Sequence, residues 1–167
     1  MVLDHVERVA YPARSNRANA VALERFCTHF GFEPMAFGSA DSAGREIYHT
    51  NVLMCIGSAF AIVGLDLIPE IRRRDEIAVR LRQSGRELIV LGEEQISELA
   101  GNAMELAGSA GPLLAISTRA KAALSNDQRA QLRHHATLLP LSVSSIELAG
   151  GSVRRMLAGV HLTRRTA

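Results

Sequence analysis

Apolar and polar residues follow two different patterns along this chain, one typical of strands and one typical of helices. Short apolar runs predict buried strands, and they lie at residues 52–56, 60–63, 87–91, 113–117 and 137–141. Apolar side chains at helical spacing predict helices after residue 19 and after Pro69. Capping signals at Thr118 and Ser125, the latter followed by Gln128, predict two more helices.

The stretch 47–57 joins proton-exchanging side chains to an apolar run and is the centre of the functional interpretation. Tyr48 and His49 lead into the strand predicted at 52–56, and Gly57 begins the turn to the next strand. This pattern predicts a buried hairpin with His49 at the rim of the sheet. Imidazole titrates near neutral pH, so it can take and return a proton in one cycle. The alternative is a solvent-exposed histidine that only caps a strand.

The remaining segments complete the predicted order of elements. A strand pair is predicted at the N-terminus, a helix N-cap at 15–19 and a helix C-cap at Gly31. Further predictions are strands at 33–37 and 103–106, short helices at 93–99 and 144–148, and a glycine turn at 150–151 that enters a closing strand through residue 162.

A strand–strand–helix–strand order therefore recurs in the segments 2–37, 52–91 and 103–141. Strands that alternate with helices throughout predict an α/β or α+β class. A length of 167 residues suits a single domain, 1–167.

Composition excludes several classes of function. The net charge is only +2, aromatic residues are 4% and tryptophan is absent, so nothing indicates a nucleic-acid partner. No apolar run approaches the ~20 residues of a membrane span, and no signal peptide is recognisable. Cys27 and Cys55 are isolated and read as buried small hydrophobes, which fits a reducing, cytoplasmic location.

Two clusters of basic residues have ordinary explanations. Arginines are frequent at 72–82, but Asp75 and Glu76 interrupt them, so a solvated helix face explains them better than an anionic partner. His134 and His135 fall at a predicted helix end, where cations suit the helix dipole. No third ligand has a sensible spacing, so a metal site is not predicted there.

Three separated motifs resemble the guanidino-group-modifying enzymes. They are YHTNVLMCIG at 48–57, AGNAMEL at 100–106 and GGSVRRMLA at 150–158. Within that superfamily the chain is most similar to the arginine-deiminase-related hydrolases of the amidinotransferase group, the kind associated with citrulline use. The segments 2–5 and 8–11 resemble that group too, so the likeness covers nearly the whole chain.

This resemblance implies a pentein fold, an α/β propeller in which ββαβ-type units surround a central axis and the active site. Three predicted units against the five of that fold imply that the chain matches the C-terminal part of such a hydrolase. The expectation is an incomplete, open ring, from a truncated product or a domain that needs partners to close. Its open edge would favour self-association into a homo-oligomer.

The resemblance also implies a chemistry and a set of residues. In the family a thiolate attacks a guanidino or ureido carbon, and a histidine protonates the leaving group and then activates water, without a cofactor or metal. His49 matches the family histidine. Arg17 is a candidate for binding the carboxylate of an arginine- or citrulline-like amino acid. Asn102 is a candidate for lining the site, and a turn-capping role is the alternative.

Two departures from the family pattern predict that the chain is inactive alone. Arg155 stands at the position of the nucleophilic cysteine, and an arginine stays protonated and is no nucleophile. The family's acidic residues that pair with the histidine and the substrate would precede Met1. The sequence thus leaves two hypotheses: a guanidino or ureido C–N hydrolase that works only when its missing parts are supplied, or a non-catalytic remnant, a pseudoenzyme, that binds a partner or ligand. A generic α/β binding or interaction domain is the remaining alternative.

Overall fold

The computed structural model describes residues 1–160, whose strands form three sheets of three strands each. The strands are β1 (Val2–Asp4), β2 (Val9–Tyr11), β3 (Glu33–Pro34), β4 (Met54–Ile56), β5 (Phe60–Val63), β6 (Glu87–Val90), β7 (Met104–Gly108), β8 (Gly111–Ser117) and β9 (Thr137–Leu141). In every sheet the first strand pairs antiparallel with the second, and the second pairs parallel with the third. The predicted order therefore occurs three times, in a mixed α/β fold.

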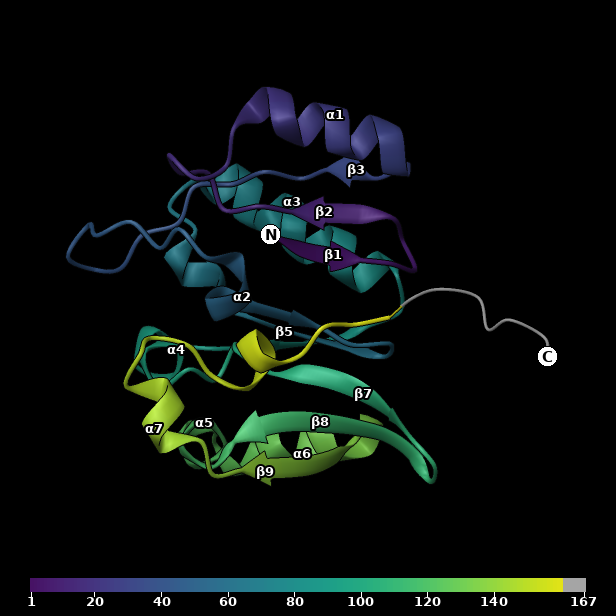
Figure 1. Ribbon diagram of the computed structural model, residues 1–167, viewed down its shortest axis with the longest axis vertical. Coiled ribbons are helices and arrows are strands. Elements are labelled where there is room, and N and C mark those ends of the chain that lie inside the picture. The colour runs from purple at the N-terminus through teal and green to yellow at the C-terminus, as the bar shows by residue number, and fades with distance from the viewer. Residues whose placement is uncertain (161–167) are drawn as a thin grey trace.

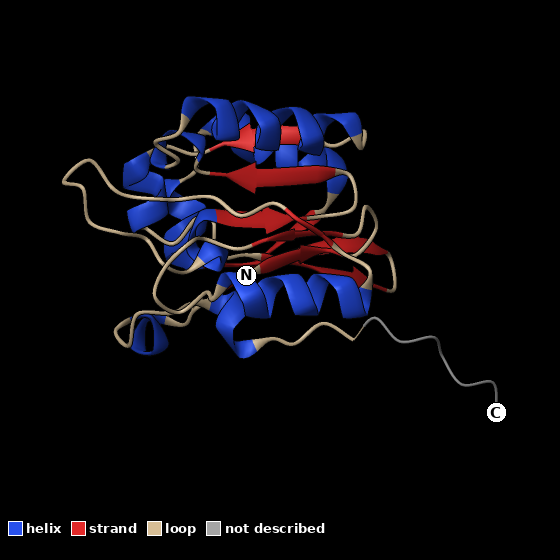
Figure 2. Cartoon of the chain, turned by 90° about the horizontal axis from the view of Figure 1, so that it is seen from above, coloured by secondary structure: helices blue, strands red, loops and turns tan. Residues whose placement is uncertain are grey.

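Helices connect the second strand of each sheet to the third. The helices are α1 (Ala20–Phe30), α2 (Thr50–Leu53), α3 (Ile71–Gln83), α4 (Glu93–Ser97), α5 (Thr118–Ala123), α6 (Asn126–His135) and α7 (Ser144–Glu147), with 3-10 turns η1 (Leu65–Leu67) and η2 (Val153–Met156). Seen from above, the strands lie inside and the longer helices lie outside them (Figure 2). Two neighbouring parallel strands cannot be joined by a tight turn, and the crossover connection between them is usually helical.

Local capping explains where the longer helices begin and end. The Asn19 side chain accepts a hydrogen bond from the backbone N–H of Ala22 at the start of α1, and Gly31 ends that helix in the left-handed conformation at φ 67°. Ser125 and Gln128 form the expected reciprocal capping box of α6. One cap prediction is wrong by a residue, because Ser117 rather than Thr118 caps α5.

Two predicted strands are shorter than their apolar runs. The run at 52–56 is divided, since α2 takes its first half and only β4 continues it as a strand. His49 is therefore the N-cap of a one-turn helix and does not lie directly at the mouth of a strand. An apolar run does not distinguish a buried helical turn from a strand, and here the Thr50 hydroxyl anchors the turn by accepting from the Ala13 N–H at 2.7 Å. The strand predicted at 33–37 is reduced to β3, with one isolated bridge at Phe37.

The closing strand predicted at the C-terminus is also wrong within residues 150–160. The chain there forms η2, because the N–H of Arg155 bonds the carbonyl of Ser152 and the N–H of Leu157 bonds that of Arg154. Residues 161–162 of the prediction lie outside the described residues.

The three units lie side by side with a common orientation (Figure 1). All three β-hairpin turns lie on one side of the molecule, and α2, α4 and α7 lie on the opposite side. The first strands are neighbours, since β1 contacts β4 and β4 contacts β7, while η2 contacts β8. The turn η2 thus brings the C-terminal segment against the third unit.

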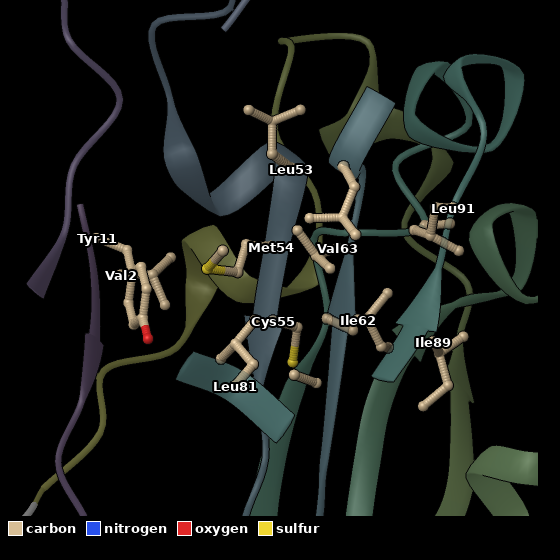
Figure 3. Packing of buried hydrophobic residues seen from close by; sticks show 14 of the residues in the cluster. Val2, Tyr11, Leu53, Met54, Cys55, Ile62, Val63, Leu81, Ile89 and Leu91 are labelled. Atoms are coloured by element: carbon tan, nitrogen blue, oxygen red, sulfur yellow. The ribbon is translucent and has the colours of Figure 1, made fainter. Parts of the chain in front are cut away.

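One apolar core joins the three units. Tyr11, Met54, Ile62 and Ile89 are almost completely buried in it and come from β2, β4, β5 and β6 (Figure 3). A separate small cluster lies under α1 and includes Cys27. Within residues 1–160, none of the helices has the length and apolar character that a bilayer crossing requires.

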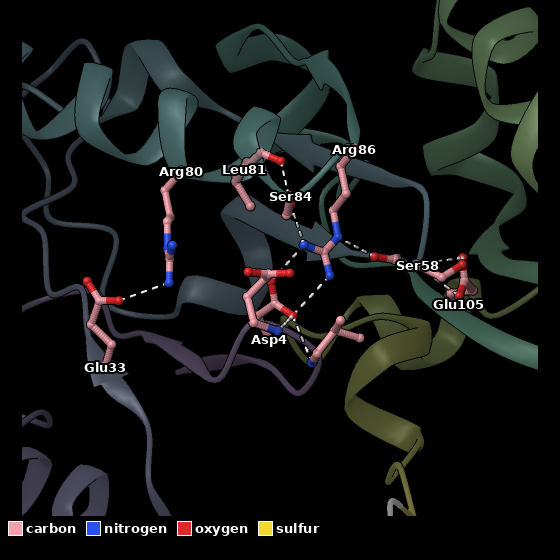
Figure 4. Close-up of polar contacts among 11 residues, drawn as sticks. Asp4, Glu33, Ser58, Arg80, Leu81, Ser84, Arg86 and Glu105 are labelled. Atoms are coloured by element: carbon pink, nitrogen blue, oxygen red, sulfur yellow. Dashed lines mark hydrogen bonds and ion pairs between the residues drawn. The ribbon is translucent and has the colours of Figure 1, made fainter.

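Polar contacts join neighbouring units as well. Arg86 donates to Asp4 of the first unit, and Glu105 of the third unit accepts from the backbone N–H and hydroxyl of Ser58 (Figure 4). The arginine-rich helix α3 pairs with nearby carboxylates, among them Arg72 with Glu76, as the sequence predicted.

Candidate functional site

His49 lies where the loop after the first unit meets α2. Its backbone is extended at φ −114° and ψ 104°, and its side chain makes no capping hydrogen bond. The ring is half-buried, and the next residue, Thr50, is fully buried and bonded to Ala13. The backbone of His49 is therefore held by the first unit, while part of its ring stays open to solvent.

Tyr48 links His49 to Arg17. The guanidinium carbon of Arg17 lies 4.8 Å from the centroid of the Tyr48 ring, a cation–π distance. The rings of Tyr48 and His49 have centroids 4.4 Å apart, at 57° to one another. The structure thus joins two of the candidate residues, Arg17 and His49, through an aromatic ring that the sequence analysis assigned no binding role.

Asn102 is a buried brace between two segments of the candidate site. Its side-chain nitrogen donates to the carbonyl of Asn51 at 2.7 Å, and its side-chain oxygen accepts from the N–H of Ser152 at 3.1 Å. The residue is only 1% exposed. These bonds hold the segment of His49 against the glycine turn at 150–151. Direct contact of Asn102 with a ligand stays a prediction.

Arg155 follows that glycine turn and lies in the space beside it. Its side chain occupies the position that a Cβ on Gly151 would take, so only glycine leaves room for this conformation. Arg155 itself is exposed. The neighbouring Ser152 is fully buried and donates its hydroxyl to Glu147 at 2.7 Å, which secures the turn.

The charges of Arg155 and Arg17 both act on His49. Partial burial is the largest cause that lowers the pKa of His49, and the positive charges of Arg155 and then Arg17 lower it further. We call Arg17, His49 and Arg155 the cationic cluster. Its members are separated by 32 and 106 residues in the sequence and are brought into one electrostatic environment by the fold.

The cysteines occupy a different environment. Cys55 lies in β4, completely buried, and this burial raises its pKa to about 11 although Arg154 opposes the shift. Burial also raises the pKa of Cys27. A protonated, buried thiol is a poor nucleophile.

Among residues 1–160, no three His, Cys, Asp or Glu side chains converge in a group that could hold a metal ion. Of the histidine pair at the end of α6, His135 contacts Glu87, with 2.7 Å between Nε2 and Oε2.

A cavity of about 560 Å³ lies beside the first strands of the three units. Its polar lining includes Asp4, Asn51, Ser58, Arg86, Glu105 and Arg154. Arg154 also donates to the carbonyl of Ala103 at 3.3 Å. Sequence reasoning singled out Arg155 and missed Arg154. The two adjacent arginines have different surroundings, since Arg154 lines the cavity and the side chain of Arg155 lies against Gly151.

Comparison with known proteins points to enzymes that act on guanidino groups. The family model described as N,N dimethylarginine dimethylhydrolase, eukaryotic, matches residues 1–162. No curated protein matches the chain.

Three solved structures share the fold at low sequence identity. Apo ArgZ, an arginine dihydrolase of the ornithine–ammonia cycle in Cyanobacteria, has 12% identity and a TM-score of 0.71 over 92% of this chain and 22% of ArgZ. The substrate-bound N-terminal domain of ArgZ has 12% identity and a TM-score of 0.68 over 90% of this chain and 51% of that domain. The ternary complex of AgrE with ornithine and NAD⁺ has 13% identity and a TM-score of 0.75 over 99% of this chain and 22% of AgrE. The chain thus spans about half the length of the N-terminal domain of ArgZ and 22% of the longer ArgZ and AgrE chains.

Proposed function

Because the chain belongs to the eukaryotic N,N dimethylarginine dimethylhydrolase family, a family of guanidino-modifying pentein-type enzymes, we propose that it binds a small guanidino or ureido amino acid at the cationic cluster. The observation that carries this proposal is that Tyr48 joins Arg17 to His49 while the Asn102 brace holds the segment of His49 against the glycine turn that precedes Arg155. In this proposal the arginines attract the carboxylate of the ligand, and His49 faces its side chain.

His49 is the general acid/base candidate. Its lowered pKa favours the neutral imidazole at neutral pH, and a neutral imidazole can accept a proton from a bound ligand or water. The Tyr48 ring lies beside the imidazole, with 4.4 Å between the two ring centroids, and this contact restricts the orientation of His49. Such a histidine supplies one half of a C–N hydrolase site. The other half is a nucleophile.

We propose that this chain by itself does not complete the hydrolytic reaction. Arg155 follows the Gly150-Gly151 turn where the resemblance expects a cysteine, and its guanidinium cannot attack a carbon. Cys55 in β4 is completely buried and its thiol is protonated at neutral pH, so it cannot replace the missing nucleophile. Loss of the nucleophile removes the covalent route as a whole.

We further propose that the three units form part of an incomplete ring and that copies of the chain associate through its open side. Large apolar side chains are exposed in the turn after β1, directly after α7 and on the C-terminal segment, namely Val6 at 72%, Leu148 at 90% and Val160 at 80%. Exposed apolar surface favours association. Sedimentation velocity should show dimers or larger species, and a monomer at the highest soluble concentration would contradict this part of the proposal.

The two free, buried cysteines suit a reducing compartment, and a cytoplasmic location is part of the proposal.

Turnover and binding must be measured separately. Release of ammonia from L-arginine and L-citrulline, and of dimethylamine from asymmetric dimethylarginine, should be at background for the wild-type chain. Arg155→Cys should restore little turnover, because no carboxylate among residues 1–160 forms an ion pair with His49. Clear turnover by the wild type would overturn the inactive assignment.

Calorimetry should detect binding of at least one of these amino acids, and Arg17→Gln should weaken it. Absence of binding would favour the alternative, an α/β interaction domain without an amino-acid ligand.

A further inference from the structure

The cavity beside the first strands is separate from the cationic cluster, since none of the described residues that line it belongs to that cluster. One wall of the cavity is apolar. Its side chains are Leu3 from β1, Ile56 from β4, Met104 from β7 and Leu157 from the segment after η2. A volume of about 560 Å³ lies in the range of small-molecule sites.

Four side chains that are charged at neutral pH also line this cavity, namely Asp4, Arg86, Glu105 and Arg154. Asp4 and Arg86 neutralise each other in their buried ion pair. Within residues 1–160, neither Glu105 nor Arg154 forms an ion pair with an opposite charge. The cavity therefore presents one carboxylate and one guanidinium, each without a counter-charge from the described chain.

The carboxylate and the guanidinium are both held in place by contacts that leave capacity for a ligand. Glu105 accepts from the backbone N–H and from the hydroxyl of Ser58, each at 3.1 Å (Figure 4). Arg154 donates to the carbonyl of Ala103 at 3.3 Å. A guanidinium has five N–H donors and a carboxylate has about four acceptor sites, so both groups can bind further partners.

The spacing of the two groups follows from β7. Ala103, which fixes Arg154, directly precedes this strand, and Glu105 is its second residue. Two residues of a strand correspond to a rise of about 7 Å. With a hydrogen bond of about 2.8 Å at each end, an ammonium and a carboxylate on the same carbon can bridge groups at such a separation.

From this arrangement we propose that the cavity is a second ligand site, which binds the zwitterion of an α-amino acid with an uncharged, apolar side chain. Arg154 binds the α-carboxylate and Glu105 accepts from the α-ammonium. The side chain of the ligand lies against the apolar wall. A simple anion would leave Glu105 unpaired beside it, and a simple cation would do the same to Arg154. A guanidino side chain would bring a charge against the apolar wall, which is costly.

The experiment is a titration of the full chain with L-leucine, followed by calorimetry and by the backbone amide signals in NMR spectra. Saturable binding is expected, with shifts of the amide signals of Ser58 and Glu105. Arg154→Gln and Glu105→Gln should each weaken the binding about tenfold or more. The matched control is Arg133→Gln, which removes an exposed arginine of α6 and should leave the affinity unchanged.

Two analogues of leucine distinguish the two charge pairs from effects on folding. Isocaproate lacks the ammonium of leucine, and isoamylamine lacks its carboxylate. Arg154→Gln should weaken the binding of isocaproate and not that of isoamylamine, while Glu105→Gln should do the reverse. A variant that only disturbs the fold would weaken both analogues. Either analogue binding as tightly as L-leucine would overturn the zwitterion site.

Arg17→Gln separates this site from the cationic cluster and should leave the affinity for L-leucine unchanged. If Arg17→Gln weakens L-leucine binding, the amino acid binds at the cluster, which overturns the second site and leaves the proposed function intact. Absence of saturable L-leucine binding, or an affinity that ignores Arg154→Gln and Glu105→Gln, would also overturn the second site. Failure of arginine and citrulline to bind would overturn the proposed function and leave this inference standing.

Discussion

Asp4 and Arg86 form an ion pair across two units in which each side chain is only 2% exposed. Arg86 Nη1 lies 2.8 Å from one carboxylate oxygen of Asp4, and Nη2 donates to the other at 2.9 Å. Nε of Arg86 donates to the carbonyl of Gly57 at 2.8 Å. The carboxylate of Asp4 also accepts the backbone N–H groups of Val6 and Glu7. One arginine therefore ties the hairpin turns of two units together.

Removing one partner of this pair should destabilise the chain strongly. Arg86→Met leaves a buried carboxylate without its counter-charge, and such changes cost about 3–5 kcal/mol. Urea unfolding measures the loss. The control is Arg72→Met, which breaks an exposed pair with Glu76 and should cost under about 1 kcal/mol. Similar losses in both variants would show that the buried pair has no special role.

A second prediction concerns the contact between Gly101 and α2. A Cβ at Gly101 would collide with the backbone carbonyl of Val52, which has no flexible end to move aside. Gly101→Ala should therefore lower the free energy of unfolding by about 1–3 kcal/mol. Gly92→Ala is the matched control, since a Cβ at Gly92 meets no atom within 4 Å and its φ is −78°. If Gly101→Ala leaves the free energy of unfolding unchanged, α2 can shift away from residue 101 without cost, which contradicts the prediction.

A third prediction concerns pH. The folded chain lowers the pKa of His49 below its ordinary value of 6.5, so below that pH the unfolded state binds more protons than the folded state. Above pH ~7 the imidazole of His49 should not change the free energy of unfolding. That free energy should fall as the pH drops through 6.5. His49→Gln should remove part of that fall in urea unfolding at pH 7.5 and 5.5.

The source of the shift can be tested by NMR titration of the His49 ring. Arg155→Gln should raise the pKa of His49 toward its ordinary value, because the positive charge of Arg155 lowers it. Arg133→Gln should leave it unchanged. A His49 pKa at or above 6.5 in the wild type would contradict the assigned surroundings.

A fourth prediction tests the Asn102 brace. Asn102→Ala removes two buried hydrogen bonds, to Asn51 and Ser152, and leaves their backbone groups unpaired. Each unpaired group should lower the free energy of unfolding by about 1–3 kcal/mol. Urea unfolding measures this loss. The variant should also weaken the effect of Arg155 on the pKa of His49. Asn16→Ala, at an exposed position, is the control and should change neither quantity.

Much of the local structure could be predicted from the sequence because its causes are local. Asn19 and Gly31 bound α1 through their own side-chain and backbone preferences, and the reciprocal bonds of Ser125 and Gln128 start α6. The apolar run after Gly57 forms β5 as predicted, and the run before Gly57 forms β4 over its second half. Repetition of this local order was enough to predict three equivalent units.

The departures from prediction arose where distant contacts decide the conformation. The bond between Thr50 and Ala13 holds α2 in place of a strand, and the bond between Ser152 and Asn102 anchors the turn that leads into η2. Periodicity carries no information about either partner. The same limit explains why Arg154, which lines the cavity, was missed.

The sequence by itself determined the class of fold and the order of the units, since both depend on neighbours within a few positions, and the resemblance of its motifs to a known family picked out Arg17, His49 and Arg155. Only the tertiary structure decided that Arg17 lies over the Tyr48 ring beside His49 and that the charge of Arg155 reaches the histidine. The physical reason is that Coulomb energy and packing depend on distance in space. The fold sets that distance through the buried bonds of Thr50 and Asn102.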